Sequence, residues 1–150
     1  MVVPVDFQAL AELRYQIRVF VSFSEEAARA QGIEPKQHQL LLAIKGLPPD
    51  MRPTVRVLAE RLRLRHHSVV ELLNRLERTG LAERTPSPTD GREILVRVTT
   101  SGERLLRKLS EAHQEELVTI GPRLLHALEV VMQRKSRKAS HGLQHSDHTR

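Results

Sequence analysis

The chain has 150 residues, of which 39% are hydrophobic, 28% are charged and only 3% are aromatic. This length and balance predict one soluble globular domain with an aliphatic core. The absence of cysteine excludes disulfides, cysteine-ligated metals and thiol chemistry. No apolar run approaches the roughly 18 residues of a membrane span, and the first residues lack the basic segment of a secretory signal. We therefore expect a cytoplasmic protein without membrane contact.

The net charge of +6 is concentrated in one part of the chain. Residues 52–108 hold thirteen Lys or Arg and seven Asp or Glu, whereas the rest of the chain holds eleven of each kind. Twelve of those thirteen cations are arginines, whose planar guanidinium suits phosphate oxygens and guanine edges. The distribution indicates a surface that binds a polyanion, although a solvated charged face would give the same composition.

The N-terminal part of the chain predicts two helices. Apolar residues at steps of three and four predict the first over residues 6–31, with Asp6 as its cap and Gly32 at its end. The second helix fits residues 34–45, with Pro35 in its first turn. Both helices are amphipathic, so each needs a partner for its apolar face.

Two further helices follow a break at residues 46–50, which are rich in glycine and proline. Thr54 is the expected N-cap of a short third helix. The fourth helix covers about 65–79 and ends before Gly80, where a left-handed residue is favoured. Such a pair with a short connection is typical of a helix-turn-helix, although many small helical domains offer similar pairs.

The next segment predicts a β-hairpin. Residues 81–85 and 94–98 are strand candidates, and the sequence between them, 86–91, has the composition of a turn. Arg92 lies beside the tip. A helix pair followed by a hairpin with a charged tip is the arrangement of a winged helix-turn-helix, in which the hairpin is the wing.

The C-terminal part predicts a further helix that starts with a capping box formed by Thr100 and Glu103. Gly121-Pro122 is expected to interrupt it, and a last helical segment covers 123–134. The polar tail at 137–150 is basic and rich in histidine, and it buries too little apolar surface to offset its ordering entropy. We therefore expect the tail to be disordered.

The terminal helices carry more apolar positions than a compact winged domain can cover. Burial against a second copy is the economical solution, while a monomer with a tight intramolecular bundle is the alternative. The predicted fold is mainly α with a small β-hairpin wing. A winged helix-turn-helix at about 34–100 is flanked by dimerisation helices at 6–31 and 101–134, within one domain of residues 1–136.

The stretch from Leu58 to Leu106 resembles the multiple antibiotic resistance regulator (MarR) family. The resemblance rests on the run Leu-Leu-Asn-Arg-Leu-Glu-Arg-Thr-Gly-Leu at 72–81, on Asp90-Gly91-Arg92 and on Val98-Thr99 before a Ser-Gly pair. It implies a homodimeric transcription regulator. In such a dimer the fourth helix enters the major groove of DNA and the wing reaches the adjacent minor groove.

The resemblance also assigns roles to individual positions. Arg92 falls on the minor-groove arginine of the wing, and Asp90 and Arg75 fall on positions that often pair and brace the wing. The positions that the family presents to DNA from the fourth helix are His66, His67, Ser68, Val70 and Glu71.

Some of these positions depart from the family pattern. Arg63 occupies a turn site where the family often has glycine, Val70 replaces a common threonine, and Glu71 replaces a common basic residue. Glu71 would repel phosphates, although its carboxylate can accept a hydrogen bond from cytosine N4. These departures bear on the operator sequence and on the strength of major-groove binding.

Most of the affinity for DNA should come from phosphate contacts. The residues expected to make them are Arg63, Arg65, Arg84 and Arg97. Simpler roles stay open for three other residues: Arg92 as a solvated tip, Asp90 as a plain turn residue, and Arg75 as a partner of Glu71 four positions earlier.

The chain lacks the motifs of an enzyme, a cofactor site or a metal site. There is no glycine-rich phosphate loop, no nucleophile elbow and no HExxH. His66 and His67 are adjacent on a predicted helix, so their side chains point about 100° apart and chelate poorly. We expect no enzyme activity, no cofactor and no metal.

The main functional hypothesis is a sequence-specific DNA-binding regulator, most simply a repressor, acting as a homodimer on a pseudo-palindromic operator in double-stranded DNA. The family resemblance implies release by a small aromatic or phenolic effector. The alternative hypothesis is a winged-helix protein-interaction module without strong DNA binding, which the acidic Glu71 in the predicted reading helix would suit.

Overall fold

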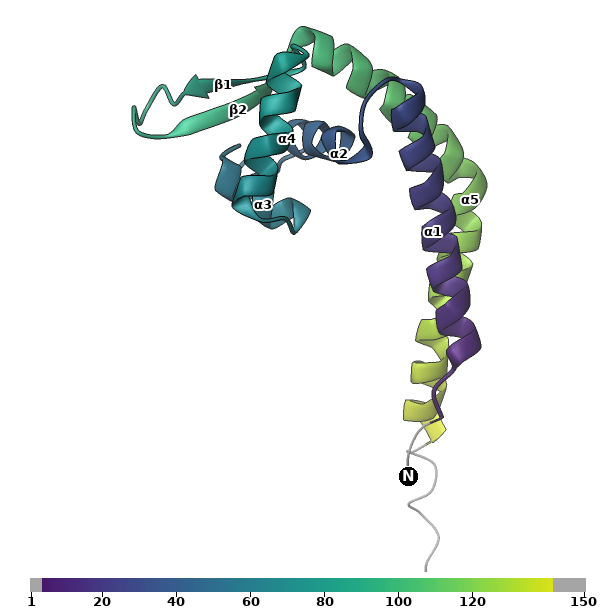
Figure 1. The fold of residues 1–150 in the computed structure, drawn as a ribbon. Helices are drawn as coiled ribbons and strands as arrows, with labels where there is room; N and C mark the ends of the chain where they lie inside the picture. The colour runs from purple at the N-terminus through teal and green to yellow at the C-terminus, as the bar shows by residue number, and fades with distance from the viewer. Residues whose placement is uncertain (1–3, 142–150) are drawn as a thin grey trace, which may run out of the picture. The chain divides into compact units, whose positions relative to one another are not determined.

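The computed structural model describes residues 4–141, with side chains described as far as residue 133. Within that range the chain forms five helices and one antiparallel hairpin, in the order α1, α2, α3, α4, β1, β2 and α5 (Figure 1). It divides into two compact units. We call Ser24–His113 the winged unit, and we call the combination of the chain up to Phe23 with the chain from Gln114 onward the helical unit.

The winged unit contains three complete helices and parts of two others. The complete helices are α2 (Pro35–Lys45), α3 (Val55–Leu62) and α4 (His66–Arg78), which pack against one another. The end of α1 (Phe7–Ala30) and the beginning of α5 (Thr100–His141) complete the set. The predicted existence and order of these helices are confirmed.

The predicted helix ends are also confirmed where a specific backbone conformation or cap was expected. Thr54 Oγ1 accepts a hydrogen bond from Val57 N (3.2 Å), so Thr54 is the N-cap of α3. Gly32 and Gly80 have φ of 77° and 71°, the left-handed region that glycine adopts without steric cost. These residues stop α1 and α4 where the apolar periodicity stops.

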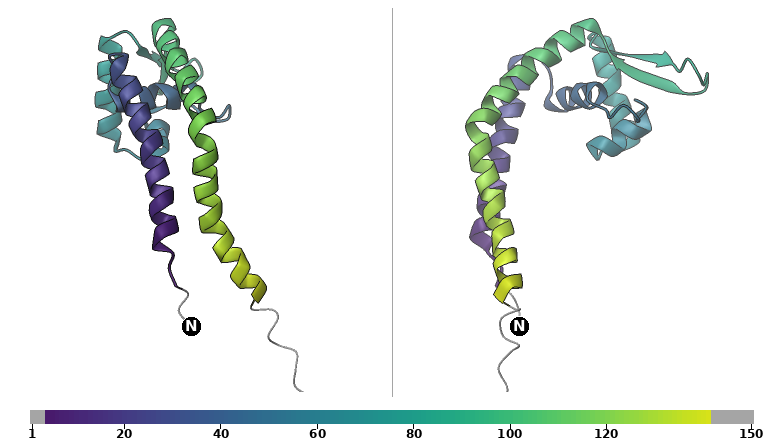
Figure 2. Two further views of the ribbon diagram at one scale, coloured as in Figure 1. Left: turned by 90° about the vertical axis from the view of Figure 1, so that its right-hand side faces the viewer. Right: turned by 180° about the vertical axis from the view of Figure 1, so that it is seen from behind.

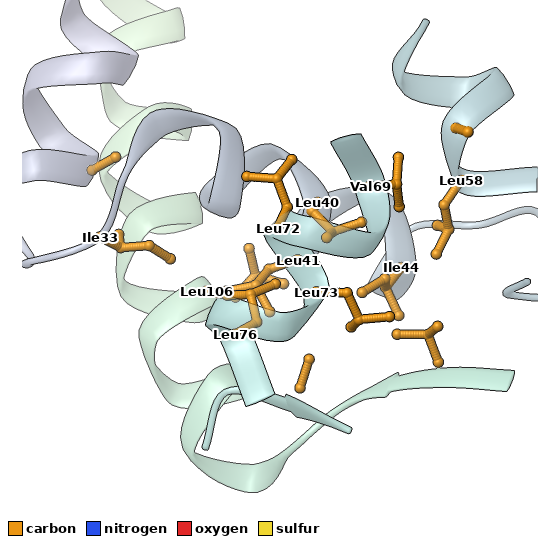
Figure 3. Packing of buried hydrophobic residues seen from close by; sticks show 14 of the residues in the cluster. Ile33, Leu40, Leu41, Ile44, Leu58, Val69, Leu72, Leu73, Leu76 and Leu106 are labelled. Carbon is orange, nitrogen blue, oxygen red and sulfur yellow. The ribbon is translucent and has the colours of Figure 1, made fainter. Parts of the chain in front are cut away.

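The core of the winged unit is aliphatic, as the composition predicts. Figure 3 shows leucine and isoleucine side chains from α2 and α4 meeting at its centre, together with Leu58 of α3 and Leu106 of α5. Several of these side chains are fully buried: Leu40, Leu41, Leu58, Leu73, Leu76 and Val69. Since burial of each such side chain stabilises the fold by about 1.5–3 kcal/mol, this cluster fixes the orientation of α4.

The hairpin follows α4 directly. Strands β1 (Ala82–Pro86) and β2 (Ile94–Val98) pair antiparallel in a register that places Arg84 opposite Val96. Val96 N also donates a hydrogen bond to Pro53 O (2.8 Å), so the connection before α3 lies along β2. The hairpin projects from the helices of the winged unit, as Figure 1 and the right-hand view of Figure 2 show. The predicted wing is therefore present.

A pair of histidines lies inside the winged unit. His38 on α2 is 2% exposed, and its ring centroid lies 5.0 Å from that of His113 on α5. His113 Nδ1 lies 2.6 Å from Leu109 O, and Nε2 lies 2.7 Å from Ser24 Oγ. Because a carbonyl oxygen only accepts, Nδ1 of His113 carries a proton. Burial, and secondarily the charge of His113, lowers the pKa of His38 to about 4.

The helical unit is built differently. Its two segments, from α1 and α5, run antiparallel (Figure 2). Asp6 Oδ1 accepts from Ala9 N (3.1 Å), so the predicted cap of the first helix is present. Within residues 4–23 and 114–133, only four side chains are buried: Ala9, Gln16, Ile120 and Ala127. The large apolar side chains that are exposed in these ranges are Val5, Phe7, Leu10, Tyr15, Ile17, Val21, Leu117, Val118, Leu125, Leu128 and Met132.

The structure differs from the sequence prediction in α5. Gly121-Pro122 does not interrupt the helix, which continues to His141. Proline removes one main-chain donor, and the helical turns on both sides outweigh that local loss. The first five residues of the tail predicted as disordered, 137–141, are therefore helical, and residues 142–150 lie outside the described range.

The cap of α5 also differs. Thr99, rather than Thr100, provides it: Thr99 Oγ1 accepts from Gly102 N (3.1 Å) and donates to Gly80 O (2.6 Å). Glu103 is engaged by Lys45 of α2 at 3.1 Å, instead of closing a capping box. Across residues 4–141, no helix is long and apolar enough to cross a membrane.

Candidate nucleic-acid interface

Helix α4 has one buried side and one outward side. Its buried side consists of Val69, Leu72, Leu73 and Leu76. The five positions predicted to contact DNA are interspersed with these buried residues along the helix. These five positions therefore lie on the outward side of α4 or at its margin. The exposed members are His66, His67 and Glu71, and the half-buried members are Ser68 and Val70. The helix therefore presents these five positions together.

The turn between α3 and α4 has an unusual backbone conformation. Arg63 has φ 56° and ψ 38°, which is the left-handed region. A non-glycine residue in that region costs on the order of 1 kcal/mol. The same position is the one where the family often has glycine, and this conformation is the physical reason for that preference. Arg63 and Arg65, the residue that precedes α4, are both exposed.

The tip of the hairpin is ordered by Asp90. Its Oδ1 accepts a hydrogen bond from Arg92 N (3.0 Å), and its carbonyl oxygen accepts from Glu93 N (3.0 Å). Asp90 is thus a turn residue, which is one of the two roles left open for it. The side chains of Asp90 and Arg92 are both exposed.

The structure does not bring Arg75 and Asp90 together. Among the ion pairs of the described residues, none joins Arg75 to Asp90, and none joins it to Glu71. Arg75 is instead an exposed arginine on the second half of α4. The brace expected between the helix and the wing is therefore not made by this pair.

Another arginine makes that brace. Arg84 of β1 donates from Nη1 to Glu77 Oε2 (2.6 Å) and from Nη2 to Asn74 Oδ1 (3.0 Å), both on α4. Its main-chain N–H donates to Glu77 Oε1 (3.0 Å). Arg97 of β2 is paired with Glu83 on the neighbouring strand. Two of the four arginines expected on phosphates are thus already engaged within the protein.

The cations of the winged unit therefore fall into two groups. Arg84 and Arg97 are neutralised by glutamates, whereas several exposed arginines have no ion pair within the described part of the chain. This second group includes Arg63, Arg65, Arg75 and Arg92. A cation without a partner next to a helix N-terminus, such as Arg65 before α4, is suited to bind an anion such as phosphate.

Sequence reasoning missed one polar cluster. Arg52, in the connection before α3, contacts Ser87, Thr89 and Glu93 of the hairpin. Arg52 and Ser87 are 35 positions apart, so no local spacing pattern links them. Only pairing of the connection with β2 brings them together.

No triplet of acidic or histidine side chains within the described residues is placed to hold a metal ion.

The central part of the chain matches a family of known proteins. Residues 31–93 match the model of the MarR family. Over this segment the chain is similar to the MarR family. The match covers the helix-turn-helix and the wing as far as Glu93, which are the elements described above.

Relatives of the chain are transcription regulators by name. An uncharacterised HTH-type transcriptional regulator of Mycobacterium leprae is 37% identical over 78 residues, which is 52% of this chain and 54% of that protein. The chain thus spans about half the length of this curated relative. The family and these relatives are regulators rather than enzymes.

Solved structures share the fold over most of the chain. A complex of Staphylococcus aureus MepR with DNA superposes with a TM-score of 0.64 at 20% identity, covering 93% of this chain and 99% of that one. CouR of Rhodococcus jostii RHA1, bound to p-coumaroyl-CoA, gives a TM-score of 0.62 at 18% identity, covering 92% of each chain. At these identities the likeness shows that the chain shares the fold of these structures.

Proposed function

We propose that this protein is a homodimeric, sequence-specific DNA-binding transcription regulator, and that it represses its target genes in the cytoplasm. The observation that carries the proposal is the placement of exposed arginines without ion pairs at two points of the winged unit. Arg63 and Arg65 lie where α4 begins, and Arg92 lies at the tip of the hairpin. The hypothesis of a winged helix on DNA requires cations at these two points.

In this proposal the two points have different tasks. The exposed side of α4, with His66, His67 and Glu71, lies in the major groove and contacts base edges. Arg92 enters the adjacent minor groove, where a guanidinium is favoured by the negative potential. Arg63 and Arg65 neutralise phosphates on either side of the helix start. Ser68, Val70 and Arg75 lie beside this surface. Arg84 and Arg97 support the wing through their ion pairs with Glu77 and Glu83.

The homodimer is part of the proposal because the helical unit leaves its apolar side chains exposed. Phe7, Leu10, Ile17 and Val21 recur at steps of three, seven and four, which places them on one side of α1. Val118, Leu125, Leu128 and Met132 recur at seven, three and four on α5. A second copy is the partner that supplies a matching apolar surface, and a two-fold dimer meets two half-sites of a pseudo-palindromic operator.

A small effector completes the proposal. The structure of CouR, which has a similar fold, holds p-coumaroyl-CoA, and this supports an aromatic or phenolic ligand as the signal for this protein. Binding of such a ligand would favour a dimer geometry that does not fit DNA, and so release it. Phenolic acids and their thioesters are the compounds to add to the titration below.

The decisive experiment is a fluorescence polarisation titration of the full chain against genomic fragments, including the region upstream of its own gene. We expect submicromolar affinity for a specific fragment. With at least two phosphate contacts from each protomer, the plot of log affinity against log salt should have a slope of about −4 or steeper. An unrelated fragment of equal length serves as the control for sequence specificity.

The alternative function predicts a different result. A winged-helix protein-interaction module would show no sequence preference among the fragments, and its weak binding would have a shallow dependence on salt. That outcome would reject the regulator, and it would shift attention to Glu71 and the outward side of α4 as a protein-binding surface.

A further inference from the structure

Arg52 connects three parts of the hairpin loop to the rest of the winged unit. Its Nη2 donates hydrogen bonds to Ser87 Oγ (2.6 Å) and to Thr89 Oγ1 (3.2 Å). Its Nε lies 3.0 Å from Glu93 Oε1. Ser87 belongs to the ascending side of the loop and Glu93 to the descending side, so one guanidinium holds both sides of the segment that carries Arg92.

The hydrogen bonds that order the loop converge on Ser87. Its side chain is buried, with 6% exposed, and its Oγ also accepts from Asp90 N (3.2 Å) and from Thr89 N (3.3 Å). Its main-chain N–H donates to Glu93 O (2.8 Å). By donating to this hydroxyl oxygen, Arg52 fixes the atom that orders the turn before Arg92.

Glu93 depends on Arg52 for its charge balance. Glu93 Oε1 is buried and makes no hydrogen bond with the described residues, because the approach of Arg52 Nε is close but not directional. The positive charge of Arg52 is therefore what compensates this carboxylate oxygen. The Glu93 side chain is 25% exposed, so after removal of Arg52 it can turn its carboxylate towards solvent and release the descending side of the loop.

The main chain prepares Arg52 for this role. The carbonyl of Pro53, the next residue, accepts from Val96 N of β2 (2.8 Å). This bond holds the connection against the base of the hairpin and leaves the Arg52 side chain to reach the loop. Arg92 adjoins Glu93 in sequence and has no ion pair within the described residues.

We propose that Arg52 is a positioning residue for DNA recognition: it holds the loop of residues 87–93 in the conformation that presents Arg92, and it acts through Arg92 rather than through a DNA contact of its own. The inference rests on the proposed function, in which Arg92 contacts DNA. A direct phosphate contact by Arg52, whose side chain is 47% exposed, is the competing explanation, and the test separates the two.

The test is a double-mutant cycle on the full chain, with DNA affinity as the readout. The variants are Arg52→Gln, Arg92→Ala and the combination of both. We expect Arg52→Gln to weaken binding about tenfold when Arg92 is present and less than about twofold when Arg92 is already alanine, since the two residues act as one unit. Arg29→Gln, which removes the same charge from α1, is the matched control and should leave affinity unchanged.

A second readout does not involve DNA. Hydrogen–deuterium exchange of the free protein reports the amides of Ser87, Asp90 and Glu93, whose acceptors lie within the loop. Arg52→Gln should accelerate their exchange while that of Leu73 in the core is unchanged. Arg52→Lys keeps the charge but lacks the fork of donors, and it should restore only part of the protection.

The outcomes are distinguishable. Equal losses of affinity from Arg52→Gln in both backgrounds would overturn the positioning role and indicate a direct contact. Unchanged exchange in the loop would overturn it as well. If Arg92→Ala leaves the affinity unchanged, the wing contact in the proposed function fails, whereas loop exchange still decides whether Arg52 holds the loop.

Discussion

The two units of this protein treat their apolar side chains in opposite ways. In the winged unit, leucines from α2, α3, α4 and α5 are fully buried within one chain. In the helical unit, an equally periodic set is exposed, and Val118 reaches 80% exposure. The same amphipathic pattern therefore leads to burial within the chain in one unit and to exposure in the other. A three-dimensional cluster of short helices covers its own apolar faces, whereas the two long segments of the helical unit leave theirs exposed, and the proposed second copy would cover them.

The largest effect is expected from placing charges on the exposed apolar side of α5. We call its residues the stripe: Val118, Leu125, Leu128 and Met132. The double substitution Leu125→Asp with Leu128→Asp should convert the proposed dimer into monomers, because each protomer would bury two carboxylates at the interface. DNA affinity should fall at least about a hundredfold with loss of the second half-site. Light scattering after size exclusion and polarisation titration measure the two effects.

The matched control for that variant lies on the same helix. Thr119→Asp with His126→Asp adds the same charge at exposed positions of α5 that lie outside the stripe. This control should remain dimeric. A monomer from both double variants would mean that charge alone, rather than the apolar stripe, decides the association.

The second prediction addresses the winged unit. Leu73→Ala, at a fully buried position, should lower the free energy of unfolding by about 2–5 kcal/mol through lost burial and a residual cavity. The dimer should persist at temperatures where the protein is folded. Urea denaturation gives the first quantity and sizing the second. Leu42→Ala, at an exposed position of α2, should change stability far less.

The third prediction concerns the buried histidine of the winged unit. Because the pKa of His38 falls to about 4 in the folded protein, the folded state binds fewer protons than the unfolded state between pH 6.5 and 4. Stability should therefore decrease as the pH falls through this window, by about 3 kcal/mol from this residue alone. Above pH 6.5 His38 contributes no pH dependence.

An NMR titration of the imidazole resonances checks this prediction directly. The resonances of His38 should begin to move only below about pH 5. A midpoint near 6.5 would show that the ring is not held neutral by burial, and that the core of the winged unit is open to water at this point.

The smallest expected effect is that of Arg63→Gly. Glycine adopts the left-handed conformation of this turn without strain, so stability should rise by up to about 1 kcal/mol. Affinity for DNA should nevertheless fall, because a proposed phosphate contact is lost from each protomer, and the salt slope should become shallower by about 2 for the dimer. Arg61→Gly, inside α3, should instead destabilise the protein by about 1 kcal/mol.

Most of the winged unit could be predicted from sequence because its signals are local. Thr54 as a cap, Gly80 at the left-handed end of α4, and the Asp-Gly turn between two strand segments each depend on neighbours within a few residues. The chain also followed the expected order of elements. The break predicted in α5 was wrong because a local signal, Gly121-Pro122, was outweighed by the helical hydrogen bonds on both sides of it.

The candidate site was predictable in position but not in detail. The sequence identified the start of α4 and the tip of the wing as the charged points, and the structure exposes Arg63, Arg65 and Arg92 there. It did not separate these residues from Arg84, which is bound to Glu77, or from Arg97, which is bound to Glu83. Composition counts charges, whereas pairing depends on distances between segments that are remote in sequence.

By itself, the amino-acid sequence determined where helices start and stop, where the hairpin turns and where the positive charge collects, because these properties depend on residues close together in the chain. Only the tertiary structure decided which arginines are available and which support the wing. Arg52 acquires its role when Pro53 pairs with Val96 and brings its guanidinium to Ser87 and Glu93. An ion pair needs its two charges within a few ångströms, and only the folded chain brings those segments together.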